Sequence, residues 1–143
     1  SFELHPMRRD SIDKALARWP ELDTARATLG ERWPDEPDGM VDIDFGNVRL
    51  TIVCGDAFSS LRASPLAFDA WYLDGFAPSR NPAMWSAEIL KAVFDHTQHG
   101  GTFATYAAAG FVRRNLMAAG FQVERRPGFA GKREMLCGTR SQD

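Results

Sequence analysis

Asp74 has the setting in this sequence that points most directly to chemistry. It lies in the stretch WYLDGFAPSRNPAMW (Trp71 to Trp85), directly after a run of apolar and aromatic residues. Gly75 lets the chain turn there without a Cβ, and Pro78 stiffens the loop that follows. Phe76 is an aromatic residue in a turn, where burial in a core is a poor explanation for it. A rigid loop that carries an acid and an aromatic side chain suits a pocket for a nucleobase better than a random connection.

Two other acids, Glu3 and Asp56, lie at the ends of expected strands. Ligands of open parallel sheets bind in a crevice at the carboxyl ends of the strands. We therefore expect Glu3, Asp56 and Asp74 to point into one crevice. The structural alternative stays open for each acid, because a strand-end acid is often only a turn former or a helix cap. In that case Asp56 would simply cap a helix from Ala57 to Leu61.

The elements that must position these acids alternate along the chain. Helical spacing of apolar residues predicts helices within 10–19, within 20–33, after Asn81 and within 107–120. Trp85 is expected in the apolar stripe of the third of these helices, and Gly120 is expected to end the fourth. Strands are expected at the start of the chain, on both sides of Gly46-Asn47 as a hairpin, and within 68–75, 100–106, 121–126 and 133–139. Strands that alternate with helices predict an α/β fold with a mainly parallel sheet.

Local details follow from residue types. Asp10 or Ser11 is expected to cap the first helix, and Asn81 to cap the helix that starts with Pro82. The continuous apolar run Ala70–Leu73 predicts a strand that is covered on both faces. The hairpin is expected to turn three side chains inward from its second strand: Val48, Leu50 and Ile52.

The last two strands are joined without a helix between them, so one of them should run antiparallel to the rest. A parallel sheet that ends in a β-hairpin is the layout of class I (Rossmann-like) methyltransferases. A single domain over residues 1–143 is the expectation from length, because 143 residues are enough for one core.

Composition excludes several classes of protein. The net charge is −2, although basic residues outnumber acids from Phe111 onward, which permits a basic face near the C-terminus. Cys54 and Cys137 lie far apart, and the three histidines form no ligand pair, so we expect no metal site. No apolar run is long enough to span a bilayer and no signal peptide is visible, which favours a cytoplasmic protein.

The sequence resembles the methyltransferase domain of the tRNA 5-methylaminomethyl-2-thiouridine biosynthesis (MnmC-like) family. The resemblance covers nearly the whole chain in order, and five segments carry it: ELHPMRRD, VCGDAFSSL, WYLDGFAPSRNPAMW, GGTFATYAAAGFVRRNLMAAGF and RRPGFAGKREMLCG. The segments LDGFAPSRNPAMW and GFAGKREML are specific to that family rather than to methyltransferases in general.

The resemblance implies that the protein transfers a methyl group from S-adenosylmethionine to the 5-aminomethyl group of wobble (2-thio)uridine in tRNA. It implies that Glu3 holds the ribose hydroxyls of the cofactor, and that Asp56, with Ala57 beside it, binds the adenine amino group. Asp74 matches the acid that acts at the substrate amine. The remaining matches belong to substrate binding: Phe76, Pro78, Asn81, Lys132 and Arg133.

One departure concerns the glycine-rich loop that follows the first strand in class I methyltransferases. The first glycine here is Gly30, and nothing like G-x-G-x-x-G precedes Glu3. We therefore expect an incomplete enzyme that lacks the first strand, its glycine loop and the first helix. The FAD-dependent oxidoreductase domain of bifunctional relatives is expected as a fused or separate partner. Two alternatives stay open: a class I methyltransferase with another acceptor, and a non-catalytic α/β binding module.

Overall fold

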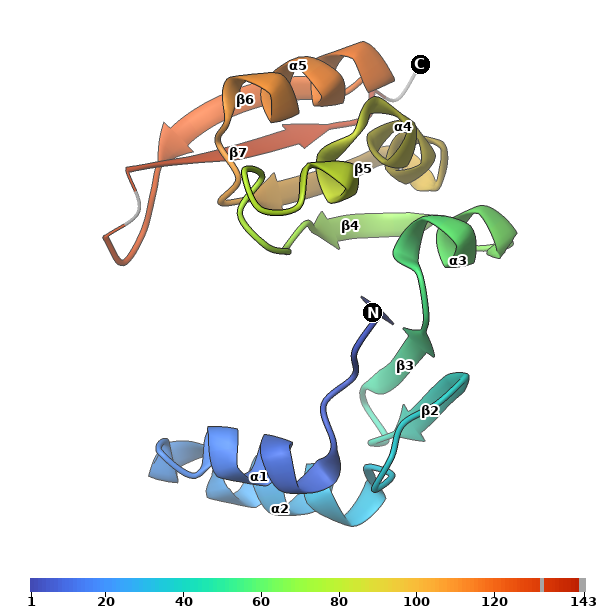
Figure 1. Ribbon diagram of the computed structural model, residues 1–143, viewed down its shortest axis with the longest axis vertical. Coiled ribbons are helices and arrows are strands. Elements are labelled where there is room, and N and C mark those ends of the chain that lie inside the picture. The colour runs from blue at the N-terminus through green and yellow to red at the C-terminus, as the bar shows by residue number, and fades with distance from the viewer. Residues whose placement is uncertain (132, 142–143) are drawn as a thin grey trace. The chain divides into compact units, whose positions relative to one another are not determined.

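The computed structural model describes residues 1–131 and 133–141, and it contains two compact units (Figure 1). The first unit is Ser1–Ala63 and the second is Ser64–Asp143. We describe each unit by itself. The expectation of a single domain over residues 1–143 therefore stays a prediction.

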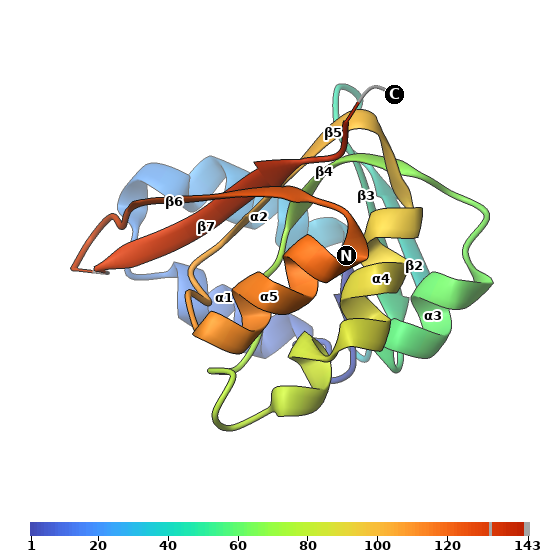
Figure 2. The ribbon, with the colours of Figure 1, turned by 90° about the horizontal axis from the view of Figure 1, so that it is seen from above.

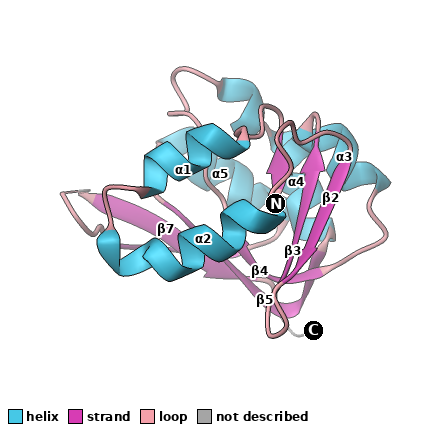
Figure 3. Ribbon diagram, turned by 90° about the horizontal axis from the view of Figure 1, so that it is seen from below, coloured by secondary structure: helices cyan, strands magenta, loops and turns pink. Residues whose placement is uncertain are grey.

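The first unit is built on a three-stranded sheet with the order β1-β3-β2. β1 (Phe2–Glu3) pairs in parallel with β3 (Arg49–Cys54), and β2 (Met40–Asp44) pairs with β3 as the antiparallel hairpin that Gly46-Asn47 predicted. The helices are α1 (Arg9–Leu16), α2 (Asp23–Arg32) and α3 (Ala57–Ala63), with a 3-10 turn at Pro20–Leu22. Figure 3 shows β2 and β3 side by side, with α1 and α2 also running next to each other.

The core of the first unit centres on three buried side chains, Trp33, Ile43 and Ile52. Ile12 from α1 and Leu29 from α2 pack against this cluster, which attaches both helices to the hairpin. The indole nitrogen of Trp33 donates to the carbonyl of Met7 at 2.9 Å, so the buried ring keeps no unpaired donor.

Two local expectations for the first unit are wrong. Neither Asp10 nor Ser11 caps α1, because the helix already begins at Arg9, and Arg8 at the cap position makes no side-chain hydrogen bond. Asp10 instead lies in the first turn, where a negative charge suits the helix dipole. Val48 is 56% exposed, because the hairpin turn extends to Val48 and β3 begins only at Arg49.

The second unit has a four-stranded sheet with the order β4-β5-β7-β6. β4 (Phe68–Tyr72) is parallel to β5 (Thr97–Thr105), whereas β7 (Glu134–Thr139) is antiparallel to both β5 and β6 (Gln122–Pro127). The predicted terminal hairpin is therefore present, and β7 is its antiparallel member. Helices α4 (Ala87–Asp95) and α5 (Gly110–Ala119) pack side by side on one face of this sheet (Figure 2).

The core of the second unit lies between these two helices and the sheet. Deeply buried apolar side chains come from α4, α5 and two strands: Leu90, Val93, Val112, Leu116, Phe103 and Leu136. Phe121 makes edge-to-face contacts with Phe94 and Phe103, with ring centroids 5.0 and 4.8 Å apart. Gly120 ends α5 as predicted, in the left-handed conformation (φ 119°) that a residue with a Cβ rarely adopts.

The expectation that the apolar run Ala70–Leu73 is covered on both faces stays a prediction. Within the second unit, β4 is the edge strand of the sheet, and α4 and α5 lie on one face of that sheet. Trp71 donates from its indole nitrogen to the buried Thr97 hydroxyl at 2.9 Å, whereas Tyr72, on the opposite face, is 88% exposed.

Candidate functional site

Asp74 begins the loop that follows β4. The amide of Leu73 still donates to the carbonyl of Ala104 at 2.9 Å, so the pairing with β5 continues up to the residue before Asp74. One carboxylate oxygen of Asp74 accepts from the amide of Gly75 at 2.8 Å. The side chain is exposed, and its other oxygen makes no hydrogen bond with a described residue. The sheet therefore holds the backbone of Asp74 while the carboxylate faces outward.

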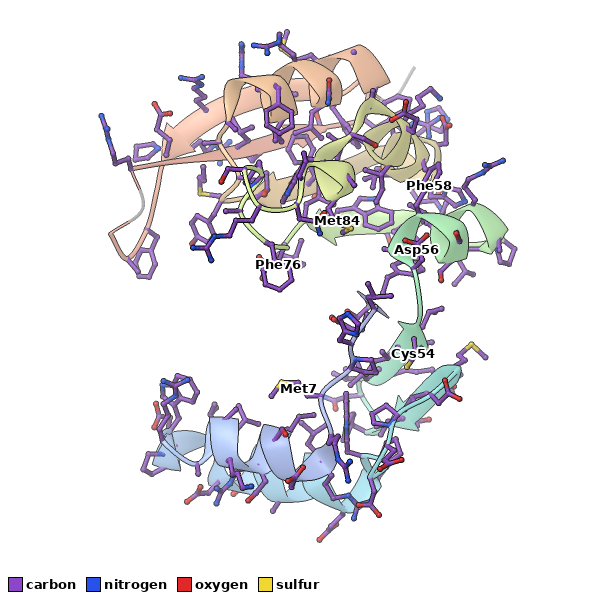
Figure 4. All side chains as sticks on the ribbon, in the orientation of Figure 1. Met7, Cys54, Asp56, Phe58, Phe76 and Met84 are labelled. Atoms are coloured by element: carbon purple, nitrogen blue, oxygen red, sulfur yellow. The ribbon has the colours of Figure 1, made fainter. Side chains whose placement is uncertain are left out.

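Phe76 and Pro78 lie further along this loop. Phe76 is 71% exposed, as the sequence predicted, and Figure 4 shows its ring projecting from the loop. Pro78 is half-buried. The amides of Arg80 and Asn81 both donate to the carbonyl of Ala77, at 2.7 and 3.1 Å, which closes the loop into a tight turn.

Asn81 does not act as the side-chain cap that the sequence predicted. It stands before the 3-10 turn Pro82–Trp85 without a capping hydrogen bond, although Pro82 does occupy the first position of that turn. The helix α4 has its own cap, because the hydroxyl of Ser86 accepts from the amide of Ile89 at 3.4 Å. The chain thus makes a separate turn before α4, and this leaves the half-buried amide of Asn81 without a role in capping.

Trp85 holds the loop to the core of the second unit. This role was not predicted from the sequence. Its ring is buried, at 3% exposure, and its indole nitrogen donates to the carbonyl of Phe76 at 3.1 Å. The side-chain amide of Asn115 on α5 in turn donates to the carbonyl of Trp85 at 2.9 Å. A tryptophan at the end of the loop motif was the available signal, but the sequence assigned it only to a helix stripe.

Glu3 and Asp56 lie at neighbouring strand ends in the first unit. Glu3 is paired with Cys54 in the parallel register of β1 and β3, and the amide of Gly55 donates to the carbonyl of Glu3 at 2.9 Å. Asp56 is the next residue. Both side chains are exposed, and the Ser1 hydroxyl donates to one oxygen of Glu3 at 2.9 Å. The parallel strands therefore place these two carboxylates at the same end of the sheet, as expected.

Asp56 also has the structural role that the sequence left open. Its Oδ1 accepts from the amide of Ser59 at 2.8 Å, at the start of α3, and Ala57 is the first residue of that helix. This hydrogen bond is the main cause that lowers the pKa of Asp56 below its ordinary value. The carboxylate is consequently ionised at neutral pH while it caps the helix.

Arg133 borders a hollow in the second unit. The hollow has a volume of about 450 Å³ and is lined by Tyr106, Ala108, Gly131, Arg133 and Glu134. Lys132, the other basic residue expected to bind substrate, lies outside the described residues. Tyr106 was not singled out in the sequence, although an aromatic residue at the end of a predicted strand was a usable signal.

The predicted site residues thus fall into separate groups. Glu3, Asp56 and Ala57 lie together in the first unit, whereas the loop from Asp74 to Asn81 and Arg133 belong to the second. The convergence of all three acids on one crevice therefore stays a prediction. Among the described residues, no three potential ligands of His, Cys, Asp or Glu gather as a metal site would need. No helix in the described part of the chain is long and apolar enough to cross a membrane.

Known proteins similar to this chain include bifunctional proteins that are much longer than it. Two of them carry the name tRNA 5-methylaminomethyl-2-thiouridine biosynthesis bifunctional protein MnmC. The one from Caulobacter sp. (strain K31) is 47% identical to this chain over 95% of its length, and the one from Aeromonas hydrophila is 42% identical over 99% of it. The chain spans only 23% and 22% of the length of these two relatives.

A solved structure and a family profile are also similar. The crystal structure of MNMC2 from Aquifex aeolicus superposes with a TM-score of 0.67 over 84% of this chain and 37% of that chain. At 23% identity it supports the α/β fold alone. The profile of the family described as S-adenosyl-L-methionine-dependent methyltransferase matches residues 20–141. The resemblance predicted from the sequence motifs is thereby confirmed, and the chain belongs to this family of S-adenosyl-L-methionine-dependent methyltransferases.

Proposed function

We propose that the protein methylates the 5-aminomethyl group of wobble (2-thio)uridine in tRNA and so forms 5-methylaminomethyl-(2-thio)uridine. The observation that carries this proposal is the 47% identity over 95% of the chain to a relative whose name states this biosynthesis. The family supplies the cofactor, S-adenosylmethionine. The exposed acid–aromatic loop from Asp74 to Phe76 supplies side chains that suit an amine on a nucleobase.

Glu3 and Asp56 fit the cofactor's adenosine. A carboxylate can accept two hydrogen bonds from a ribose diol, which is the role we assign to Glu3. Asp56 is ionised, and because its Oδ1 is used by the cap, its Oδ2 is the oxygen available to the adenine amino group. Both side chains are exposed at neighbouring strand ends, so a ligand can reach them without displacing buried groups.

Asp74 would act on the substrate amine. When bound, S-adenosylmethionine supplies an electrophilic methyl group. An aminomethyl group is largely protonated at neutral pH, and its nitrogen attacks only with a free lone pair. The Asp74 carboxylate attracts the ammonium form, orients the nitrogen and accepts its proton. Phe76 stacks on the uracil ring, and Pro78 and Asn81 restrict the loop that forms the wall of the pocket.

The class I type of the fold, the cellular location and a partner domain belong to the same proposal. β1 and β4 are each paired on one side only among the described residues, and each is parallel to its neighbour. We assign the parallel strands of each unit to the fold of class I (Rossmann-like) methyltransferases. A cytoplasmic location follows from the tRNA substrate. A FAD-dependent oxidoreductase domain, fused or separate, is the proposed partner, because the relatives are called bifunctional.

Two other functions would use the same fold. A class I methyltransferase with another acceptor would not need the acid, glycine and aromatic side chain of the Asp74 loop together. A non-catalytic binding module would not need an exposed carboxylate on a loop that the core holds in place. Neither alternative explains why the most family-specific segment of the sequence is this loop.

The test is methyl transfer from labelled S-adenosylmethionine to tRNA that lacks only this methyl group, with the complete gene product. Label that comigrates with tRNA and depends on a wobble aminomethyl-uridine supports the proposal. Transfer to another acceptor would support the first alternative. Cofactor binding without any transfer would support the binding module.

A further inference from the structure

The hollow beside Arg133 has two walls. One wall is the connection after β5, where the amide of Ala107 donates to the Thr105 hydroxyl and the amide of Ala108 donates to the Tyr106 carbonyl, both at 3.0 Å. Thr105 is itself buried. These bonds fix the backbone of Tyr106, whose ring stays 52% exposed at the rim.

The other wall is the loop of the terminal hairpin. The amide of Gly128 donates to the carbonyl of Arg133 at 3.2 Å, which closes the loop just before β7. Gly131 is in the left-handed conformation, with a φ of 84°. Arg133 borders the same hollow as Tyr106.

Among the described residues that line the hollow, the charges leave Arg133 as an available cation. Glu134 pairs with Arg125 at 3.5 Å, so its negative charge is largely matched. The guanidinium of Arg133 is exposed and makes no hydrogen bond or ion pair with any other described residue. A guanidinium with no protein partner next to an exposed aromatic ring can bind a phosphate by two parallel hydrogen bonds.

We propose that this hollow binds a single-stranded RNA nucleotide that flanks the modified uridine. Tyr106 stacks on its base, and Arg133 binds its phosphate. The volume of about 450 Å³ leaves room for one nucleotide, and the open rim lets the RNA chain continue on both sides. The inference rests on the proposed function for the identity of the RNA. It adds a second contact, apart from the Asp74 loop, that recognises RNA by stacking rather than by base sequence.

The experiment measures binding of a fluorescently labelled anticodon stem–loop RNA to the complete gene product across a series of salt concentrations. Tyr106→Ala should weaken binding by about 5- to 100-fold without changing the salt slope, because stacking carries no charge. Tyr106→Phe should bind as the wild type does. Arg133→Gln should make the slope of log K against log salt shallower by about 0.7 to 0.9.

Arg126→Gln is the matched control, because Arg126 lies on the same hairpin but is paired with Glu124 at 3.0 Å. Its salt slope should be that of the wild type. A fully paired duplex of equal length should lose no affinity in Tyr106→Ala, and uridine monophosphate alone should bind far more weakly than the stem–loop. Strong binding of the monophosphate would reassign the hollow to a free nucleotide and overturn the RNA subsite.

Methyl transfer by the wild type separates the two proposals. If the wild type methylates tRNA but both Tyr106→Ala and Arg133→Gln bind the stem–loop normally, the subsite is wrong and the proposed function stands. If the wild type binds the stem–loop through these residues but transfers no methyl group, the proposed function is wrong and the subsite stands. No stem–loop binding by the wild type would overturn both.

Discussion

The indole nitrogen of Trp85 donates a hydrogen bond to the carbonyl of Phe76 at 3.1 Å, and so ties the loop that starts at Asp74 to the buried core of the second unit. Asn115 on α5 continues this connection by its 2.9 Å bond to the carbonyl of Trp85. Asp74 and Phe76 are exposed, yet their backbone is held by a side chain that is almost fully buried. An exposed loop can thus keep one conformation without burial of its own side chains.

Trp85→Phe should lower the turnover number by about tenfold or more, because it removes the hydrogen bond that places Phe76 and the preceding carboxylate, together with part of a buried ring. The loss of stability should be about 2 kcal/mol or more, because a hydrogen bond and buried volume are both lost. Trp33→Phe is the control, since Trp33 is also buried and donates to a backbone carbonyl, that of Met7, at 2.9 Å. Steady-state kinetics measure the turnover number of both variants, and thermal melting measures their stability. Equal turnover in the two variants would remove the positioning role of Trp85.

Asp74→Asn should abolish most transfer without unfolding the protein, because the exposed side chain keeps its shape but loses the charge that attracts and deprotonates the amine. Asp69→Asn is the matched control, since Asp69 is an exposed acid on β4. Turnover of the control should equal that of the wild type. Near-normal turnover in Asp74→Asn would show that the carboxylate has no catalytic role.

The two roles of Asp56 can be separated by substitution. Asparagine is as good a helix cap as aspartate, so Asp56→Asn should keep the stability of α3 but weaken cofactor binding, whereas Asp56→Ala should lose both. Loss of the charge at Asp56 or at Glu3 should weaken S-adenosylmethionine binding by about ten- to a hundredfold. Calorimetry measures both affinities. Unchanged cofactor affinity in Asp56→Asn would leave Asp56 as a helix cap only.

The cap of α3 should also depend on pH. The hydrogen bond from Ser59 lowers the pKa of Asp56 below its ordinary value of 3.8. A group whose pKa is lower in the folded state stabilises the fold above 3.8, and this stabilisation disappears as the pH falls through the lower folded pKa. The difference in stability between wild type and Asp56→Ala should therefore be constant near neutrality and shrink in acid. Denaturant titrations at a series of pH values measure it, and a difference that grows in acid would contradict the assignment.

Two glycines should respond in opposite directions to alanine. A Cβ at Gly138 on β7 would lie 2.1 Å from the carbonyl oxygen of Gln122 and 2.6 Å from the ring of Phe103, so Gly138→Ala should destabilise the protein by about 1–3 kcal/mol or more. A Cβ at Gly30 in α2 would meet nothing within 4 Å, and Gly30→Ala should stabilise it by about 0.5–1 kcal/mol. Chemical denaturation compares the two. A stable Gly138→Ala protein would show that β6 and β7 pack less closely than described.

Much of the fold could be predicted from the sequence because the decisive signals are local. Gly46-Asn47 predicted the hairpin of β2 and β3, and Gly120 predicted the end of α5, since each depends on backbone conformations that few residues adopt. The absence of a helix between the last two strands predicted an antiparallel neighbour. These features need no knowledge of distant contacts.

The errors concern features that depend on neighbours in space. The position of β4 at the edge of its sheet could not be predicted, because apolar residues alone do not tell an edge strand from a central one. The anchor formed by Trp85 depends on α5, which lies 30 residues further along the chain at Asn115. Asp56 was the intermediate case: both of its possible roles were visible in the sequence, and the structure shows that at least the capping role is real.

The most direct test of the account is nucleoside analysis by mass spectrometry of tRNA that carries 5-aminomethyl-(2-thio)uridine, before and after incubation of the complete gene product with S-adenosylmethionine. The account predicts that the wobble nucleoside gains one methyl group on its side-chain nitrogen, in wild type and Asp69→Asn but not in Asp74→Asn. A wobble nucleoside that remains unmethylated with the folded, cofactor-binding wild type would contradict it, as would a methyl group placed on any other atom of the tRNA.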